Sequence, residues 1–174
     1  MASSGDLRKY IRDIPDFPTP GIVFKDIMPL LRDSGAFQST VEQLSRLHAD
    51  VDLVCGIDAR GFILAGAVAL EMGVGFVPIR KKGKLPGETD SISYLLEYGE
   101  AELEMQADGI QPGQQCLIVD DVIATGGTAA AAADLIFRRG GLLVGYAFLL
   151  ELAFLQGVKK LPQPETARSL VVYD

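Results

Sequence analysis

The sequence predicts an α/β fold with a mostly parallel sheet, because two stretches share the order strand, turn, helix, strand. The first runs from Val51 to Ile79 and the second from Cys116 to Leu149. Such units form right-handed crossovers between parallel strands of one sheet. The length of 174 residues fits one compact domain with a sizeable core. We therefore expect a single domain over residues 1–174.

Turn residues divide each unit into its elements. The expected elements are a strand over Val51–Gly56, a helix over Phe62–Met72 capped by Gly73, a strand over Val74–Ile79, a strand over Cys116–Val119 and a helix over Ala129–Arg139. Between the units, Ser91–Tyr98 and Ala101–Gln106 are expected to form a small antiparallel hairpin. The strand-to-helix loops over 56–61 and 120–128 then stand at the carboxyl edge of the strands, where open α/β sheets bind ligands.

Composition and charge exclude several classes of protein. Sixteen Lys and Arg against 23 Asp and Glu leave a net charge of −7, which disfavours general nucleic-acid binding. The most apolar stretch, Leu142–Leu155, is interrupted by Glu151 and is too short to cross a bilayer. The first residues lack the apolar run of a secretory signal, and Cys55 and Cys116 are expected to be small buried hydrophobes. We expect a cytoplasmic protein that binds neither nucleic acid nor membrane.

The loop over 120–128 carries the clearest functional pattern, in which a buried strand is followed by two carboxylates and a turn of small residues. Gly126 and Gly127 allow conformations that expose backbone N–H groups. Thr125 and Thr128 add hydroxyl donors at the positive end of the next helix. Together these groups predict a site for a phosphate monoester.

The two adjacent carboxylates, Asp120 and Asp121, cannot favourably face that phosphate. They can accept hydrogen bonds from the vicinal hydroxyls of a sugar, so the pattern indicates ribose 5-phosphate. Two alternatives remain: the acid pair holds a metal while the glycines close the loop, or Thr125 or Thr128 caps the helix with no ligand. The loop has neither the P-loop lysine nor the dinucleotide pattern GxGxxG, which disfavours ATP hydrolysis and NAD chemistry.

The thirteen residues from Cys116 to Thr128 resemble the phosphoribosyl pyrophosphate signature of type I phosphoribosyltransferases. Four more stretches resemble the adenine-using members of that family, in the same order along the chain: Phe17–Ile27, Gly56–Phe62, Arg80–Gly87 and Leu96–Gly99. The resemblance implies the type I phosphoribosyltransferase fold, with a central, mostly parallel sheet flanked by helices. It also implies a small N-terminal hood built mainly from residues 1–35.

The same resemblance implies an enzyme of purine salvage, a pentosyltransferase that converts adenine and phosphoribosyl pyrophosphate to AMP and pyrophosphate. It further implies that Mg²⁺ is carried by the substrate, with no metal held directly by the protein, and that the chain forms a homodimer. The rival enzyme is a transferase for another purine, such as xanthine or hypoxanthine. The rival outside enzymes is a phosphoribosyl pyrophosphate sensor, whose usual DNA-binding module needs length and basic charge that this chain lacks.

The resemblance also assigns residues to the parts of the reaction. It places the 5-phosphate on Ala124, Thr125, Gly126, Gly127 and Thr128, and the ribose on Asp120 and Asp121. Pyrophosphate is expected to be bound by Asp58, Ala59, Arg60, Arg80, Lys81 and Lys84, and adenine by Val23, Phe24 and Lys25. Glu97 is the expected general acid–base residue. The departing pyrophosphate needs positive charge beside it, which Arg60 and the basic run can supply inside an acidic chain. Without the resemblance, the basic run is a solvated loop and Glu97 an exposed hairpin residue.

For the base, an extended backbone supplies the selectivity. The Val23 carbonyl and the Lys25 N–H point to one edge of such a segment, where the first accepts from the exocyclic amine of adenine and the second donates to N1. A 6-oxo purine presents the opposite pattern and leaves buried groups unpaired, so discrimination should be strong. The resemblance implies that Phe24 stacks on the purine, whereas the pattern by itself favours a core Phe. His48, the only histidine, lies far from these loops, which disfavours a Ser-His-Asp hydrolase.

Overall fold

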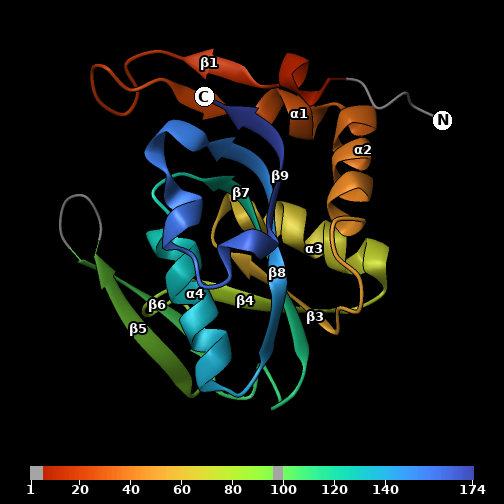
Figure 1. Cartoon of the computed structure of the whole chain (residues 1–174), viewed down its shortest axis with the longest axis vertical. Helices are drawn as coiled ribbons and strands as arrows, with labels where there is room; N and C mark the ends of the chain where they lie inside the picture. Colours follow the sequence, from red (N-terminus) through yellow and green to blue (C-terminus); the bar gives the residue numbers. More distant parts are fainter. Residues whose placement is uncertain (1–5, 96–99) are drawn as a thin grey trace. The chain divides into compact units, whose positions relative to one another are not determined.

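The structure, a computed structural model, describes residues 6–95 and 100–174, and the chain divides into two compact units, residues 1–43 and 44–174 (Figure 1). The elements of the first unit are η1 (Leu7–Tyr10), β1 (Arg12–Ile14), β2 (Phe24–Asp26), α1 (Met28–Arg32) and most of α2 (Ser34–Ser45). Strands β1 and β2 pair antiparallel, with Asp13 opposite Lys25. The first unit is therefore a small sheet followed by two helices.

The second unit contains a seven-stranded sheet with the strand order β5-β6-β4-β3-β7-β8-β9. Its strands are β3 (Leu53–Ile57), β4 (Gly75–Lys81), β5 (Thr89–Leu95), β6 (Glu100–Gln106), β7 (Gln115–Ile123), β8 (Leu142–Leu152) and β9 (Ala167–Tyr173). The strands from β4 to β9 in that order pair parallel, whereas β6 pairs antiparallel with both β4 and β5. The predicted α/β class with a mostly parallel sheet is confirmed.

Two helices of the second unit cover opposite faces of this sheet. Helix α3 (Arg60–Met72) connects β3 to β4, and α4 (Gly127–Arg138) connects β7 to β8. These two connections step in opposite directions along the sheet, so right-handed crossovers place their helices on opposite faces. Figure 1 shows α4 in front of the strands and α3 behind them. Gly73 ends α3 in the left-handed conformation, as the sequence predicts.

The main core of the second unit lies between α4 and the sheet. Ile57 of β3 and Ile118 of β7 pack there with Leu135 and Ile136 of α4, and all four are buried. Residues with the opposite parity along the strands face α3, because side chains alternate across a sheet. The free thiols Cys55 and Cys116 are both buried, as expected for small apolar residues. The apolar content of the chain is thus used to join helices to the sheet.

Strand β7 is longer than the sequence predicts. The expected strand ends at Val119, but the observed one continues to Ile123 because β8 still pairs with it through Leu150 and Glu151. The prediction that Asp120 and Asp121 lie in a loop is therefore wrong. Both are strand residues, and their side chains leave β7 in opposite directions.

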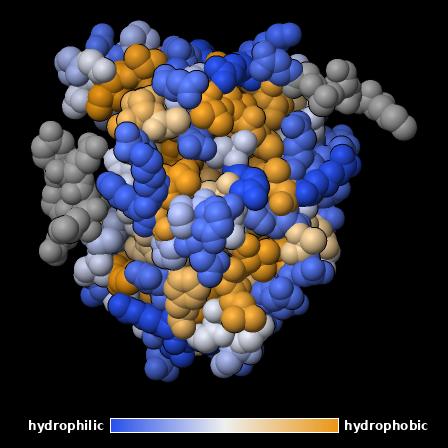
Figure 2. Space-filling model, in the orientation of Figure 1, coloured by the Kyte–Doolittle hydropathy of each residue, from blue (hydrophilic) through white to orange (hydrophobic). Residues whose placement is uncertain are grey.

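Three short 3-10 helices follow β8: η2 (Ala153–Leu155), η3 (Gly157–Lys160) and η4 (Pro164–Thr166). Apolar and polar residues are interspersed over the face drawn in Figure 2. Within the described ranges, no helix combines the length and the apolar character needed to cross a membrane.

Candidate active site

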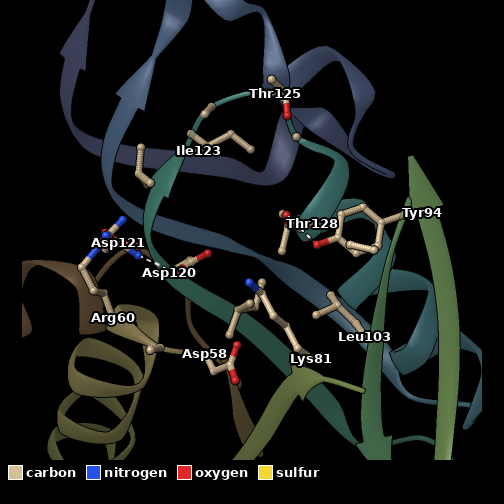
Figure 3. Close-up of a pocket in the computed structure, with 17 residues that line it drawn as sticks. Asp58, Arg60, Lys81, Tyr94, Leu103, Asp120, Asp121, Ile123, Thr125 and Thr128 are labelled. Carbon is tan, nitrogen blue, oxygen red and sulfur yellow. Dashed lines mark hydrogen bonds and ion pairs between the residues drawn. The ribbon is translucent and has the colours of Figure 1, made fainter. Parts of the chain in front are cut away.

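The connections that follow the neighbouring strands β3 and β7 run in opposite directions along the sheet. The chain leaves β3 toward α3 and β4 on one side, and leaves β7 toward α4 and β8 on the other. The loops after these two strands diverge, which leaves a crevice at the carboxyl edge, the usual ligand position in open α/β sheets. A cavity of about 420 Å³ opens there (Figure 3). Its size is in the range of small-molecule sites.

Residues from five strands, two loops and the first turns of α3 and α4 line this cavity. They are Ile57, Asp58, Ala59, Arg60, Lys81, Tyr94, Ala101, Leu103, Asp120, Asp121, Val122, Ile123, Ala124, Thr125, Gly126, Thr128 and Ala129. Most residues predicted for the 5-phosphate, the ribose and the pyrophosphate are among them. Gly127, Arg80 and Lys84 are not: Gly127 is the first residue of α4, and the other two belong to the end of β4 and the turn after it.

The turn between β7 and α4 has the form that an anion site needs. Gly126 adopts a φ of +84° as the residue before the helix, and no side chain caps the first turn of α4. The alternative in which Thr125 or Thr128 caps the helix is therefore wrong. Thr128 Oγ1 instead donates a hydrogen bond to the Tyr94 hydroxyl at 3.3 Å, within the cavity (Figure 3). The first backbone N–H groups of α4 remain for an anion at the positive helix end.

The two acids of β7 have different environments. Asp121 is 5% exposed, and its Oδ2 accepts a hydrogen bond from Arg60 Nε at 2.5 Å. Asp120 Oδ1 accepts the Asp121 backbone N–H at 2.8 Å. Burial, together with the neighbouring Asp121 carboxylate, raises the pKa of Asp120 well above its usual range. The acid pair therefore combines one ion-paired carboxylate with one that is costly to ionise.

Asp120→Asn is expected to stabilise the folded chain at neutral pH while weakening phosphoribosyl binding. Because the folded pKa is raised, ionisation of Asp120 destabilises the fold once the pH rises above the unfolded value of about 3.8. Below that pH the variant and the parent should unfold alike, and the advantage of the variant should grow until the pH passes the folded pKa. The melting temperatures of both proteins are measured from pH 3.5 to 8. A difference of about 1 kcal/mol in the free energy of unfolding should shift the melting temperature by about 2–4 °C.

The control is Asp108→Asn, because Asp108 is an exposed acid of the turn after β6. Its unfolding curve should follow the parent at every pH. A difference between Asp120→Asn and the parent that does not grow with pH would contradict the assignment.

The pyrophosphate candidates separate into two groups. Asp58, Ala59 and Arg60 follow β3 directly and line the cavity with Lys81. Arg80 instead donates from Nε to Asp58 Oδ2 at 3.1 Å, and its guanidinium lies 5.6 Å from the centre of the Phe62 ring. Arg80 thus reaches the cavity through Asp58, and Lys84 is joined to Arg80 by its carbonyl, which accepts from Arg80 Nη1 at 3.1 Å.

The adenine candidates lie in the first unit, where neighbouring residues support the extended backbone. Lys25 Nζ lies 2.8 Å from Asp13 Oδ1, and Phe24 meets Phe17 edge to face with ring centres 5.3 Å apart. Val23 is 47% exposed. Glu97, the predicted acid–base residue, lies outside the described residues.

Two residues of this region have no signal in the sequence pattern. Tyr94 is one of several residues in a predicted strand, and only the packing of β5 beside α4 brings its hydroxyl to Thr128. Gly157 of η3 packs closely against the turn 124–128, since a Cβ at this position would lie 2.1 Å from the Ala124 carbonyl oxygen. Both contacts join residues about thirty positions apart, beyond the reach of local periodicity.

Comparisons with known proteins show which family the chain belongs to. The model of the phosphoribosyl transferase domain matches residues 33–166. An adenine phosphoribosyltransferase of Thermobifida fusca is 56% identical over 159 residues, which cover 90% of each chain. The crystal structure of adenine phosphoribosyltransferase from Thermoanaerobacter pseudethanolicus has a TM-score of 0.94 and 46% identity, covering 98% of this chain and 100% of that one. The Saccharomyces cerevisiae enzyme, complexed with adenine and an imino-altritol bisphosphate, has a TM-score of 0.88 and 39% identity, covering 97% of each chain.

The chain belongs to the phosphoribosyltransferase family, and its fold is the type I phosphoribosyltransferase fold. Within that family, the relatives named above are all adenine phosphoribosyltransferases. The predicted family, fold class and enzyme class, a pentosyltransferase, are confirmed.

Proposed function

We propose that the chain is a cytoplasmic enzyme of purine salvage that transfers the phosphoribosyl group of phosphoribosyl pyrophosphate to adenine, forming AMP and pyrophosphate. The observation that carries this proposal is the cavity at the carboxyl edge of β3 and β7, where an uncapped helix start, the acid pair Asp120–Asp121 and the cations Arg60 and Lys81 meet. Each of these parts matches one portion of the donor substrate. The names of relatives that are up to 56% identical support adenine as the acceptor.

The donor is proposed to lie across the cavity with its 5-phosphate on the turn 124–128. Backbone N–H groups donate to the phosphate at the start of α4. The Thr128 hydroxyl joins them by exchanging its hydrogen bond to Tyr94 for one to the phosphate. The ribose diol donates to Asp120 and Asp121, and Arg60 holds the second of these acids in place. Pyrophosphate then lies toward Asp58–Arg60 and Lys81, whose cations stabilise the negative charge that develops as the C1′–O bond breaks.

Magnesium is proposed to arrive with phosphoribosyl pyrophosphate, as the family resemblance implies, held by the oxygens of the substrate and not directly by the protein. When bound with the substrate, the ion would neutralise part of the pyrophosphate charge.

The base is proposed to be recognised by the hood. Val23, Phe24 and Lys25 carry the backbone groups and the ring assigned to adenine, on an extended segment braced by Asp13 and Phe17. Glu97 is proposed to handle the proton on the imidazole side of adenine as the bond to C1′ forms. Both assignments rest on the family resemblance.

Pyrophosphate release tests the proposed function directly. The enzyme, phosphoribosyl pyrophosphate and Mg²⁺ are combined with adenine, hypoxanthine, guanine or xanthine in parallel, with a reaction lacking base as control. We expect release with adenine alone, because a 6-oxo purine reverses the donor and acceptor pattern. Release with another base would establish the rival transferase, and donor binding without release from any base would establish a sensor.

A homodimer is proposed as the working assembly. Ile63 and Leu70 lie seven residues apart on α3, hence on one face, and are 44% and 84% exposed. An exposed apolar pair of this kind supports an interface between copies of the chain. Leu70→Glu should weaken the dimer by at least about tenfold in sedimentation experiments, because it places a charge in an apolar contact. Leu142→Glu, at a site 56% exposed on β8, is the control and should leave the dimer intact.

A further inference from the structure

A buried carboxylate beside the cavity is not used by the proposed chemistry. Glu104 of β6 is 3% exposed, and the antiparallel ladder places it opposite Arg80 of β4. Its Oε1 accepts the backbone N–H groups of Lys84 and Leu85, both at 2.7 Å. Its Oε2 lies 3.5 Å from Thr89 Oγ1. The turn after β4 therefore wraps its backbone donors around one acid side chain.

These donors also decide the charge of Glu104. Burial alone raises the pKa of this carboxyl, but the backbone N–H groups of Leu85, Gly83 and Lys84 outweigh burial and lower the pKa. The side chain is thus a carboxylate at neutral pH. Hydrogen bonds to a charged acceptor are the stronger kind, so the turn is held more firmly than by neutral contacts.

Packing does not fix the turn by itself. Gly83 and Gly87 have φ of +80° and +79°, and a Cβ at either position would meet nothing within 4 Å. The two ends of this segment are attached to β6 and the residue after it: Lys82 N–H donates to the Glu102 carbonyl at 3.0 Å, and the Glu88 carbonyl accepts from Ala107 N–H at 2.9 Å. Between these ends, Glu104 holds the backbone N–H groups of Lys84 and Leu85, so loss of its carboxylate should loosen residues 83–85.

The held turn leads to the cavity in two further steps. The Lys84 carbonyl accepts a hydrogen bond from Arg80 Nη1 at 3.1 Å. Arg80 Nε in turn donates to Asp58 Oδ2 at 3.1 Å, and Asp58 lines the cavity. A carboxylate on β6 is therefore connected, through one turn and one guanidinium, to the loop that follows β3.

We propose that Glu104 is a positioning residue for pyrophosphate: it holds the turn 83–85, and through the Lys84 carbonyl it orients Arg80 and Asp58 at the edge of the cavity. This inference rests on the proposed function, because it takes that edge as the pyrophosphate side. Glu104 touches no substrate. It acts by fixing groups in advance, which lowers the cost of ordering them when the anion binds.

The test compares Glu104→Ala and Glu104→Gln with Glu102→Ala. Glu102 lies two residues away on the same strand, and its carboxylate pairs with Lys82 Nζ at 2.8 Å and Ser91 Oγ at 2.6 Å. It accepts side-chain donors only in these contacts, so it is a matched control for loss of an acid from β6. Two measurements are made on the full chain: tryptic cleavage after Lys84, followed by mass spectrometry, and affinity for magnesium pyrophosphate by calorimetry.

Glu104→Ala should speed cleavage after Lys84 and weaken pyrophosphate binding, each by about tenfold, the effect of losing hydrogen bonds to a charged acceptor. Glu104→Gln should fall between Ala and the parent, because it keeps one carbonyl acceptor. The KM for adenine should stay within about twofold of the parent, since a general loss of structure would change every constant together. Glu102→Ala should match the parent in both measurements.

Several outcomes would overturn the proposal. Parental cleavage and affinity in Glu104→Ala would show that the turn does not depend on the carboxylate. Faster cleavage with parental affinity would leave Glu104 a structural residue only. If Glu104→Ala does not fold, Glu104→Gln replaces it, and parental values in that variant are equally decisive. If the unmodified chain binds no pyrophosphate, the proposed function itself fails, whereas a defect confined to the Glu104 variants concerns positioning alone.

Discussion

Gly126→Ala is expected to lower kcat/KM for phosphoribosyl pyrophosphate by about 10²-fold, because a displacement of the phosphate turn near 1 Å is enough to cost that much. Two features of Gly126 oppose any side chain. Its φ of +84° is a left-handed conformation, and a Cβ would lie 2.2 Å from the Gly157 carbonyl oxygen. The second contact is between main-chain positions, so no rotamer change can relieve it. Steady-state kinetics with the donor varied is the measurement.

Gly113→Ala separates these two effects. Gly113 has the same φ of +84°, but a Cβ there would meet nothing within 4 Å. Alanine at this position should reduce the free energy of unfolding by about 1–2 kcal/mol, the cost of a left-handed residue, and leave the kinetics unchanged. Equal losses of activity in the two variants would remove the Gly157 contact from the explanation.

Gly157→Ala is expected to raise the KM for phosphoribosyl pyrophosphate by roughly 10- to 100-fold, although Gly157 is not assigned any contact with substrate. Its Cβ would lie 2.1 Å from the Ala124 carbonyl oxygen and 2.8 Å from the Gly126 nitrogen. The 3-10 helix η3 and the turn must therefore move apart. Kinetics with the donor varied, and the affinity for AMP, report this movement.

Gly35→Ala is the control for Gly157→Ala. Gly35 lies in α2, where the nearest atom to a Cβ would be Asp33 Oδ1 at an ordinary 3.5 Å, so alanine should be neutral or slightly stabilising. If Gly157→Ala binds the donor as the parent does, the turn can shift away from η3 without loss, and the expected rigidity is wrong. Together the four glycine variants separate backbone conformation, close contact and overall stability.

Local signals in the sequence were enough for the fold class and for most of the cavity. The apolar runs before Asp58 and Asp120 predict neighbouring parallel strands, and the rule for open sheets then places both following loops at one edge. The structure brings Asp58, Arg60 and the turn 124–128 together at that edge. The 5-phosphate, ribose and pyrophosphate assignments remain predictions about ligands.

Features that depend on distant pairing could not be predicted in this way. Strand β7 continues past Val119 because β8 pairs with it there, so its length depends on a neighbouring strand and not on local sequence alone. Tyr94 joins the cavity through the packing of the hairpin beside α4, and Gly157 through the return of the chain after β8. The sequence gives Glu104 no distinguishing feature within its strand, because the Lys84 N–H that it accepts comes from a turn twenty positions away.

The position of the cavity between β3 and β7 means that a bound donor should stabilise more than the loops it touches. These strands pair through Val54 and Leu117 in the middle of the sheet, but in the chain α3, β4 and the β5–β6 hairpin lie between them. A ligand that binds the loops after both strands stabilises only states in which β3 and β7 are paired and the intervening elements are folded. Phosphoribosyl pyrophosphate should therefore slow amide hydrogen exchange throughout the central strands, and not merely in the loops that touch it.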